Sequence, residues 1–318
     1  MTPSSQNRHD PLPPAGPGRI VPPGPSTIDL HMHTTRSDGI VAPADLVAAA
    51  AASGVRLLAL TDHDTLAGYR EVLATGAIPD GVELLSGVEI NAIVTRDIGL
   101  WEGELHILGF GMDPDDEAFE ATLAAQRGRR RERFDRTVAR LRELGYPIDD
   151  QVADLTGSDE DALGRPTVAR ALIGAGHAES VEDAFNRFLA WGQPGYIPRT
   201  GLDPIEAIAA IRAAGGLPAL AHFPEAPARI EVVRELAEEG LGGLEVHYRS
   251  FDADTVRAVG EVAAKLGLVA TGGTDYHGDL GPYAGAHAAL WVPPEVGPRL
   301  LRAVESASVT AARSSGVA

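Results

Sequence analysis

The sequence predicts an α/β fold with a mainly parallel sheet that is interrupted by a helical insertion. Short apolar runs recur along the chain, and most of them end in Gly, Asp or His and are followed by alanine-rich amphipathic segments. Such alternation of strands and helices is typical of a mainly parallel sheet. Between about Met112 and Thr200 the pattern changes, because the chain becomes charged, helical in periodicity and poor in strands.

Seven apolar runs are the candidate strands. Several of them are separated by candidate helices, such as residues 42–54 and 203–216. In the first of these helices, Pro43 stands near the start and Gly54 just past the end, which is the usual arrangement at helix termini. The candidate strands cover residues 26–33, 55–61, 82–90, 104–111, 217–222, 242–248 and 268–275.

The same patterns divide the chain into three parts. Residues 1–26 contain eight prolines and no hydrophobic periodicity, so we expect a disordered tail. The α/β domain is expected over residues 27–112 and 202–318, and the helical insertion over residues 113–201. No internal repeat is detectable.

Composition narrows the chemistry and the partners. There are no cysteines, so disulfides, thiolate nucleophiles and thiolate metal sites are excluded. With 27 Lys and Arg against 45 Asp and Glu, the formal net charge of −18 would repel a long polyanion, and long duplex nucleic acid is not an expected partner. The sequence has no long apolar run, and its first residues contain no apolar block. We therefore expect a cytoplasmic protein without membrane contact.

Histidines and carboxylates gather at the ends of the candidate strands. Residues i and i+2 of a strand point to the same side, so His31 and His33 should project together with Asp29. Because the carboxyl ends of parallel strands share one rim, similar residues at other strand ends should approach this pair. These further residues are His63, Glu89, His222, Asp275 and His277.

His106 differs because it lies near the start of its strand. Only a short segment separates this strand from Glu89, too short for a helical crossover but sufficient for an antiparallel return. A strand that returns in this way begins at the rim where its predecessor ends. His106 is therefore expected at the same rim.

These motifs closely resemble those of the PHP family, the polymerase and histidinol phosphatase superfamily of metal-dependent phosphoesterases. The resemblance covers the chain from Asp29 to Gly278 and implies a distorted (β/α)7 TIM-like barrel with two to three divalent metal ions at its C-terminal rim. Nitrogen and oxygen donors suit Mn, Fe or Zn alike, and Mn is the first expectation. The motifs are "DLHMHTTRSDG", "LTDHD", "GVEI", "LHILGF", "LAHF" and "GGTDYHG".

The resemblance also implies how the ligands are shared. Asp62 and Asp64, on either side of His63, are expected to fix imidazole tautomers rather than to bind metal. Asp38, His63 and His222 are the expected catalytic residues. One metal would be bound by His31, His33, Glu89 and Asp275, a second by Glu89, His106 and His277, and a third by Asp38, His63 and His222.

The insertion resembles that of the 3',5'-nucleoside bisphosphate phosphatases and small 5'-3' exoribonucleases within this family. It carries eight arginines between Arg127 and Arg142, and on a helix Phe134, Val138 and Leu141 would share one face. Arg129, Arg133, Arg136 and Arg140 would share another face, which is either a solvated basic surface or a phosphate-binding surface.

The resemblance favours phosphate binding for three arginines. In this group, arginines of the helix and of the "GRP" and "YIPR" motifs reach substrate phosphates, and they correspond here to Arg133, Arg165 and Arg199. A guanidinium fork fits phosphate oxygens well. This chain reads "GRPT" where the group commonly reads "GRPH", so Thr167 replaces a histidine.

The expected function is hydrolysis of a phosphomonoester in a small nucleotide. The expected substrates are nucleoside 3',5'-bisphosphates, which would lose the 3'-phosphate, and the 5' ends of short RNA. The alternatives are a cyclic phosphate phosphodiesterase, a histidinol-phosphatase-like enzyme, against which the insertion argues, and a non-catalytic metal-binding regulatory module. The complete ligand set argues against the last of these.

His247, beside Glu245, is a further candidate for substrate contact. The sequence leaves the oligomeric state open.

Overall fold

The computed structural model describes residues 24–94, 103–155, 163–278 and 281–314. All seven predicted strands are confirmed, and they form one sheet in which the strands follow chain order. The expected proline-rich tail lies outside the described residues, apart from residues 24–26. The strands are β1 (Ile28–Asp29), β2 (Leu57–Leu60), β3 (Glu83–Ile93), β4 (Glu104–Phe110), β5 (Leu217–Leu220), β6 (Gly243–Tyr248) and β7 (Val269–Gly273).

The sheet curls into a nearly closed barrel, as the resemblance implies. Neighbouring strands are parallel except around β4, which pairs antiparallel with both β3 and β5. The predicted antiparallel return after Glu89 is therefore confirmed. The chain just after β1 lies beside β7 and the residues that follow it. There the backbone N–H of Leu30 donates to Gly272 O at 3.0 Å, and the backbone N–H of Asp275 donates to His31 O at 2.7 Å.

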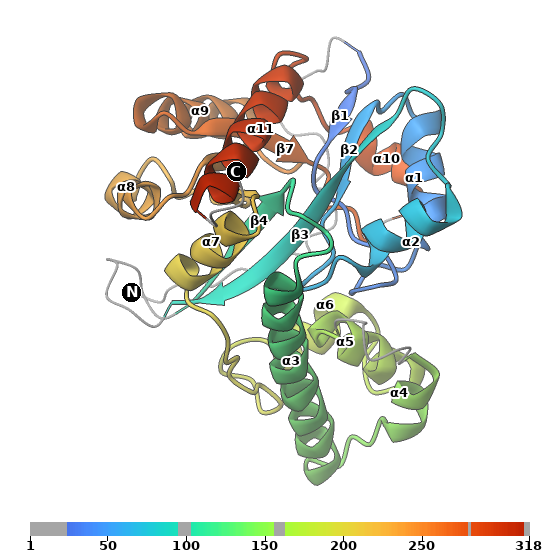
Figure 1. Cartoon of the computed structure of the whole chain (residues 1–318). Helices are drawn as coiled ribbons and strands as arrows, with labels where there is room; N and C mark the ends of the chain where they lie inside the picture. The colour runs from blue at the N-terminus through green and yellow to red at the C-terminus, as the bar shows by residue number, and fades with distance from the viewer. Residues whose placement is uncertain (1–23, 95–102, 156–162, 279–280, 315–318) are drawn as a thin grey trace.

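Helices cover the outside of the barrel (Figure 1). Pro43 begins the first helix, and Gly54 follows its end with a φ of 101° that favours glycine. Another helix begins with a capping box between Asp203 and Glu206, in which each side chain accepts from the other residue's backbone N–H. The helices are α1 (Pro43–Ala52), α2 (Ala67–Thr75), α7 (Pro204–Ala213), α8 (Ile230–Glu238), α9 (Ala253–Leu266), α10 (Tyr283–His287) and α11 (Val296–Ser314).

The helical insertion lies between β4 and α7 and extends to one side of the barrel (Figure 1). It has its own apolar cluster, to which the predicted face of Phe134, Val138 and Leu141 contributes. Its elements are α3 (Glu117–Glu143), α4 (Asp149–Leu155), α5 (Arg165–Gly174), α6 (Val181–Ala184) and a π-helical turn η1 (Phe185–Leu189).

The structure divides the predicted arginine face of α3. Arg129, Arg136 and Arg140 are exposed, but Arg133 is buried. The segment between η1 and α7 covers Arg133, and the Arg133 Nε donates to Ile197 O at 2.7 Å. A helical wheel cannot anticipate this, because a segment distant in sequence provides the cover.

None of the helices in the described part of the chain has the length and apolar character that a bilayer crossing requires.

Candidate metal centre

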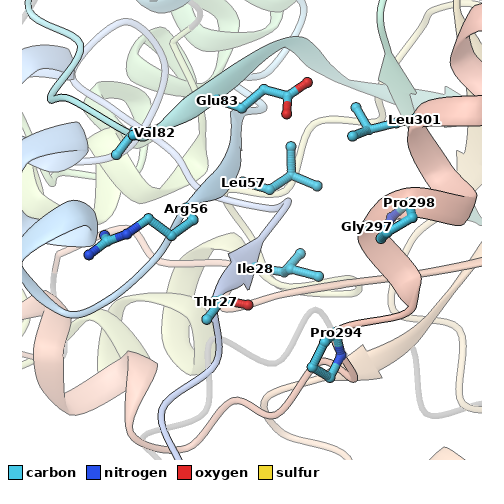
Figure 2. Close-up of a pocket in the computed structure, with 11 residues that line it drawn as sticks. Thr27, Ile28, Arg56, Leu57, Val82, Glu83, Pro294, Gly297, Pro298 and Leu301 are labelled. Atoms are coloured by element: carbon cyan, nitrogen blue, oxygen red, sulfur yellow. The ribbon is translucent and has the colours of Figure 1, made fainter.

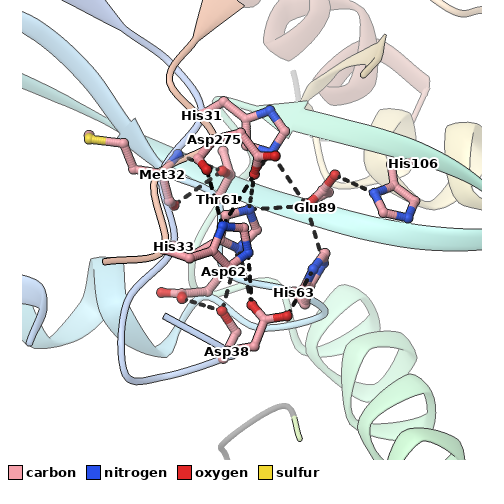
Figure 3. A network of polar contacts seen from close by, with 12 residues as sticks. His31, Met32, His33, Asp38, Thr61, Asp62, His63, Glu89, His106 and Asp275 are labelled. Carbon is pink, nitrogen blue, oxygen red and sulfur yellow. Dashed lines mark hydrogen bonds and ion pairs between the residues drawn. The ribbon is translucent and has the colours of Figure 1, made fainter. Parts of the chain in front are cut away.

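The nine histidines and carboxylates predicted from the sequence gather at the rim formed by the C-terminal ends of the parallel strands. Figure 3 labels His31, His33, Asp38, His63, Glu89, His106 and Asp275 of this set. His31 and His33 follow β1, His63 follows β2, and Asp275 and His277 follow β7. Glu89 lies within the long strand β3. It occupies the centre of the network, with contacts to His31, His33, His63, His106 and His222.

The first expected group lies together. The His33 Nε2 is 3.1 Å from Glu89 Oε2 and 3.3 Å from Asp275 Oδ1. The His31 Nε2 is 3.4 Å from the same Glu89 oxygen and 3.3 Å from the same Asp275 oxygen. Two imidazole nitrogens and two carboxylate oxygens therefore converge on one small volume. Asp29 does not join them, because its carboxylate accepts hydrogen bonds from Thr274 and Tyr283 instead.

The other two groups differ from the expected partition. His222 lies with Glu89 and His106, its Nε2 being 3.3 Å from Glu89 Oε1, whereas we expected it beside Asp38 and His63. His277 lies with His33, Asp38 and His63, its Nε2 being 3.2 Å from Asp38 Oδ1.

The order of the strands explains this exchange. His222 ends β5, whose neighbour β4 carries His106, and the backbone N–H of Ala221 donates to His106 O. His277 follows β7, which meets the segment after β1, and His33 N donates to Tyr276 O. Neighbours in the barrel therefore share a group, and the expected catalytic trio of Asp38, His63 and His222 is divided between two groups.

Strained backbone conformations occur at three strand ends of this rim. Asp64, His222 and Asp275 are the non-glycine residues with positive φ in the described chain, at 54°, 28° and 49°. Such conformations are unfavourable for residues with a Cβ and are found mostly at functional sites. One compensating contact is the hydrogen bond that the His222 backbone N–H donates to Glu245 Oε2 at 2.7 Å.

Several buried ring and carboxylate atoms at the rim fit a metal cluster. Within the described chain, four such atoms have no hydrogen-bond partner, namely His31 Nε2, His33 Nε2, Asp38 Oδ1 and His63 Nδ1. Buried polar atoms are almost always hydrogen-bonded. Their convergence, with nitrogen and oxygen donors only, fits divalent cations such as Mn, Fe or Zn.

The pKa values at the rim reflect an accumulation of negative charge. Burial alone would raise the pKa of Glu89, but the imidazoles of His106 and His63 outweigh it and hold the pKa well below its ordinary value. Burial would lower the pKa of His33, but the nearby carboxylates of Asp275 and Glu89 raise it to about 10. The clustered carboxylates thus require positive charge, which either imidazole protons or metal cations can provide.

The predicted role of the aspartates beside His63 is wrong. Asp62 accepts hydrogen bonds from the Thr34 N–H and hydroxyl and from the Ser37 hydroxyl, so it holds the loop after His33. Asp64 Oδ2 accepts from Arg130 Nε at 3.0 Å and Nη2 at 2.7 Å. Neither carboxylate bonds an imidazole directly, although the Ser37 hydroxyl that donates to Asp62 lies 3.5 Å from His33 Nδ1.

Sequence analysis also missed the residue that orients His31. The carboxylate of Glu245, fully buried on β6, lies 3.1 Å from His31 Nδ1 and also accepts from the His222 backbone. Such a carboxylate fixes which imidazole nitrogen faces the metal. The detectable signal was a lone acidic residue inside an apolar strand, in "GLEVHY".

A second missed contact links the insertion to the rim. The Arg130 guanidinium of α3 bonds the Asn91 side-chain oxygen, and the Asn91 amide contacts His106 Nε2. Arg130 is one of the eight arginines in the basic run, but its position in that run does not distinguish it from its neighbours.

The three predicted substrate arginines lie around one carboxylate at the start of β4. Arg199 Nε is 3.4 Å from Glu104 Oε1, and Arg165 Nη2 is 4.0 Å from Glu104 Oε2. Burial would raise the pKa of Glu104, but Arg199 and Arg165 outweigh it and lower that pKa. Burial, followed by repulsion from Arg199 and Arg165, lowers the pKa of Arg133. We call these four residues the arginine cluster; Thr167 is buried nearby in α5.

His247 does not join the rim. Burial lowers the pKa of His247 to about 4, and its charged neighbour is Glu295, which precedes α11. A shift in register between Glu245 and His247 interrupts the pairing of β6 with β7. The side chains of Glu245 and His247 therefore need not lie on the same face of the sheet, as they would in a strand with regular alternation.

A pocket of about 420 Å³ lies at the opposite end of the barrel (Figure 2). It is lined by the first residues of β1, β2 and β3, by the residues just before these strands, and by Pro294, Gly297, Pro298 and Leu301 around the start of α11. None of the predicted site residues lines it. In barrel enzymes the chemistry lies at the C-terminal face, which is where the histidines gather here.

The fold and the rim define the class of protein, a metal-dependent phosphoesterase on a TIM-like barrel, and comparisons with known proteins support this class. Residues 29–151 match the PHP domain family. The chain is 32% identical over 260 residues to the 3',5'-nucleoside bisphosphate phosphatase of Chromobacterium violaceum, covering 79% of this chain and 87% of that protein. It is 33% identical over 258 residues to a 5'-3' exoribonuclease of Haemophilus influenzae, covering 78% and 89%.

A solved structure agrees. A chain from Bifidobacterium adolescentis, described as a metal-dependent phosphoesterase, matches with a TM-score of 0.76 and 33% identity, covering 89% of this chain and 97% of that one. This chain therefore belongs to the PHP family, and it is a metal-dependent phosphoesterase.

Proposed function

We propose that this enzyme removes the 3'-phosphate from nucleoside 3',5'-bisphosphates and also acts at the 5' ends of short RNA. The observation that carries this proposal is the arginine cluster beside the metal centre. Glu104 and His106 are two residues apart on β4, and Glu104 contributes to the electrostatic environment of His106. A substrate could thus place one phosphate at the rim and a second at the arginines.

The charge of the arginine cluster supports an anionic ligand. Three guanidinium groups surround a single carboxylate, which leaves a formal excess of two positive charges. Arg133 Nη2 and Arg199 Nε are buried without a hydrogen-bond partner in the described chain. A phosphate offers oxygen acceptors that match guanidinium donors in geometry and charge. A substrate with only one phosphate, bound at the rim, would leave the excess positive charge of the arginine cluster without an anionic partner.

The nine rim residues are the proposed metal ligands, with Glu89 shared between groups. Divalent ions bound there would act as Lewis acids. They would also lower the pKa of bound water, so that hydroxide is available as a nucleophile near neutral pH. We propose Mn, with Fe or Zn as alternatives, and two to three ions. We keep the ligands named at the outset as the proposal and group His222 with Glu89 and His106, and His277 with Asp38 and His63, which the side-chain clusters support.

The protein's own groups position the reactants. The Tyr248 hydroxyl donates to Asp275 Oδ2 at 2.9 Å and holds that carboxylate toward His31 and His33. Among the rim residues we propose Asp38, His63 and His222 as those nearest the reacting phosphate. Such prior orientation lowers the entropic cost of an in-line attack.

The chain's parts take different roles in this proposal. The barrel, residues 27–112 and 202–318, would hold the metals. The insertion, residues 113–201, would supply Arg133, Arg165 and Arg199 for the second phosphate.

The test is phosphate release from a substrate panel. Protein loaded with Mn should hydrolyse adenosine 3',5'-bisphosphate faster than adenosine 3'-monophosphate, and chelator-treated protein should hydrolyse neither. A cyclic nucleotide and histidinol phosphate in the same panel examine the two rival activities. Preferred hydrolysis of either compound, or equal rates on the bisphosphate and the monophosphate, would contradict the proposal.

A further inference from the structure

One carboxylate lies among the three guanidinium groups proposed for the second phosphate. Glu104 is the first residue of β4, and its side chain is largely buried, as are those of Arg165 and Arg199. It lies against the same guanidinium groups that a substrate phosphate would need. A protein anion in this position either holds the arginines in place or competes with the phosphate, and these two roles predict opposite effects of its removal.

The distances argue against the first role. Glu104 Oε1 is 3.4 Å from Arg199 Nε, and Glu104 Oε2 is 4.0 Å from Arg165 Nη2. Both distances exceed the roughly 2.7–2.9 Å of a hydrogen bond between charged groups. Glu104 Oε2 and Arg199 Nε are also buried without a hydrogen-bond partner in the described residues. The carboxylate therefore leaves donors of the arginine cluster available to a ligand.

Other groups position two of the three arginines. Arg133 Nε donates to Ile197 O at 2.7 Å, and the Arg133 guanidinium carbon lies 5.8 Å from the centroid of the Tyr196 ring. The Arg165 guanidinium carbon lies 5.5 Å from the centroid of the Phe185 ring in η1. A guanidinium over an aromatic face is stabilised there by the charge distribution of the ring. None of these contacts depends on the charge of Glu104, so we expect the arginines to stay in place without it.

A competing carboxylate matters most after the reaction. Hydrolysis of the 3'-phosphate consumes water, releases inorganic phosphate and leaves a nucleoside 5'-monophosphate, whose remaining phosphate still lies at the arginine cluster. Affinity for this phosphate is common to substrate and product, so it lowers KM without raising kcat and delays release of the product. A carboxylate beside the same guanidinium groups repels the phosphate, and in a partly buried site solvent screens this repulsion only weakly.

We propose that Glu104 lowers the affinity of the arginine cluster for a phosphate, so that the nucleoside 5'-monophosphate leaves after hydrolysis. This inference rests on the proposed function and adds to it a residue that governs product release. Glu104 acts on the phosphate that does not react, whereas the rim acts on the one that does. Its removal should therefore strengthen binding of every ligand that places a phosphate at the arginine cluster.

The test is isothermal titration of the Mn-loaded, full-length protein with adenosine 5'-monophosphate. Glu104→Gln should lower the Kd by at least about 10-fold, because a like charge beside the phosphate is removed. Glu104→Asp keeps the charge and should bind like the wild type. Combining Glu104→Gln with Arg199→Ala should remove most of the gain. Glu143→Gln removes a carboxylate from an exposed ion pair with Arg140 on α3 and is the matched control, with unchanged Kd.

Kinetics show whether the effect lies at the arginine cluster. In Glu104→Gln, the KM for adenosine 3',5'-bisphosphate should fall together with the Kd for adenosine 5'-monophosphate, and kcat should not rise. The KM for adenosine 3'-monophosphate, which has no phosphate for the cluster, should stay at the wild-type value, and so should the metal content. An equal change for the 3'-monophosphate, or loss of metal, would place the effect at the rim and overturn the inference.

The binding measurement separates this inference from the proposed function. Tighter binding of adenosine 5'-monophosphate in Glu104→Gln, without hydrolysis of any bisphosphate by the wild type, would overturn the proposed function and leave the effect of Glu104 on phosphate affinity standing. Preferred hydrolysis of the bisphosphate by the wild type, with unchanged or weaker binding of the 5'-monophosphate in Glu104→Gln, would overturn the inference alone. Weaker binding would show that the carboxylate holds the arginines in place.

Discussion

The candidate metal centre and the arginine cluster are neighbouring sites that differ in the sign of their charge and in the elements that supply their side chains. At the rim, carboxylates and imidazoles extend from strand ends that the barrel holds in place, and Glu89 alone contacts five histidines. In the arginine cluster, side chains from α3, from α5 and from the segment before α7 surround one carboxylate of β4. The first cluster has excess negative charge, and the second has excess positive charge.

This difference indicates how the two sites are filled. Excess carboxylate in a buried site is stabilised by cations, and excess guanidinium by anions. A phosphorylated substrate and its metals together satisfy both. In the proposed function, the barrel would therefore hold the metals, and the insertion would select the substrate, as loops and insertions on rigid scaffolds commonly do.

The largest expected effect comes from removing the central carboxylate of the rim. Glu89→Gln should lower kcat/KM for adenosine 3',5'-bisphosphate by more than about 100-fold, which exceeds the usual cost of losing a partner outside the ligand shell. The metal content of the dialysed protein, measured by elemental analysis, should fall as well. Glu83→Gln, at the exposed start of the same strand, is the control. Unchanged metal content in Glu89→Gln would refute its role as a ligand.

The next effect separates the two clusters. Arg199→Ala should lower kcat/KM for the bisphosphate by about 10-fold to 100-fold, because a hydrogen bond between charged groups contributes about 1.5–3 kcal/mol. Activity on adenosine 3'-monophosphate and metal content should hardly change. Arg257→Ala, exposed on α9, serves as control. If both substrates lost activity equally, the arginine would not select the second phosphate.

A comparable but indirect effect is expected from the carboxylate behind His31. Glu245→Gln should weaken Mn binding by about 10-fold to 100-fold, the usual range for a group that orients a ligand. Isothermal titration with Mn would measure this change. Glu295→Gln, exposed before α11, should bind Mn normally. A variant Glu245→Gln with normal Mn affinity would show that His31 needs no such support.

The smallest effect concerns acid stability outside both clusters. Burial lowers the folded-state pKa of His247 to about 4, below the ordinary value of 6.5. The neutral ring therefore stabilises the folded state fully above about pH 6.5, and this contribution is lost as the pH falls towards 4. Between pH 7 and pH 4, His247→Gln should lose about 2–3 kcal/mol less of its unfolding free energy than the wild type. Urea titrations at both pH values would measure these free energies. If wild type and variant lost the same unfolding free energy between pH 7 and pH 4, the prediction would be refuted.

Local patterns identified the rim residues for a simple reason. Each strand is a short apolar run, and its polar end residue stands out where the run stops, as at His63 and His222. The short connection after Glu89 even determined that His106 lies on a returning strand. The exchange of His222 and His277 was missed, because a ligand group depends on which strands are neighbours in the barrel. The burial of Arg133 was not predicted, because the segment that covers it is more than fifty residues away in sequence.

The sequence by itself determined the strands, the helical insertion and the residue types at the rim, since hydrophobic periodicity and strand ends are local properties of a chain. Only the tertiary structure decided the grouping of the rim residues, the contact of Glu245 with His31, the contact of Arg130 with Asn91 and the burial of Arg133. The physical reason is that these features depend on distances between segments far apart in sequence. Barrel closure and the docking of the insertion set those distances, and no local pattern records them.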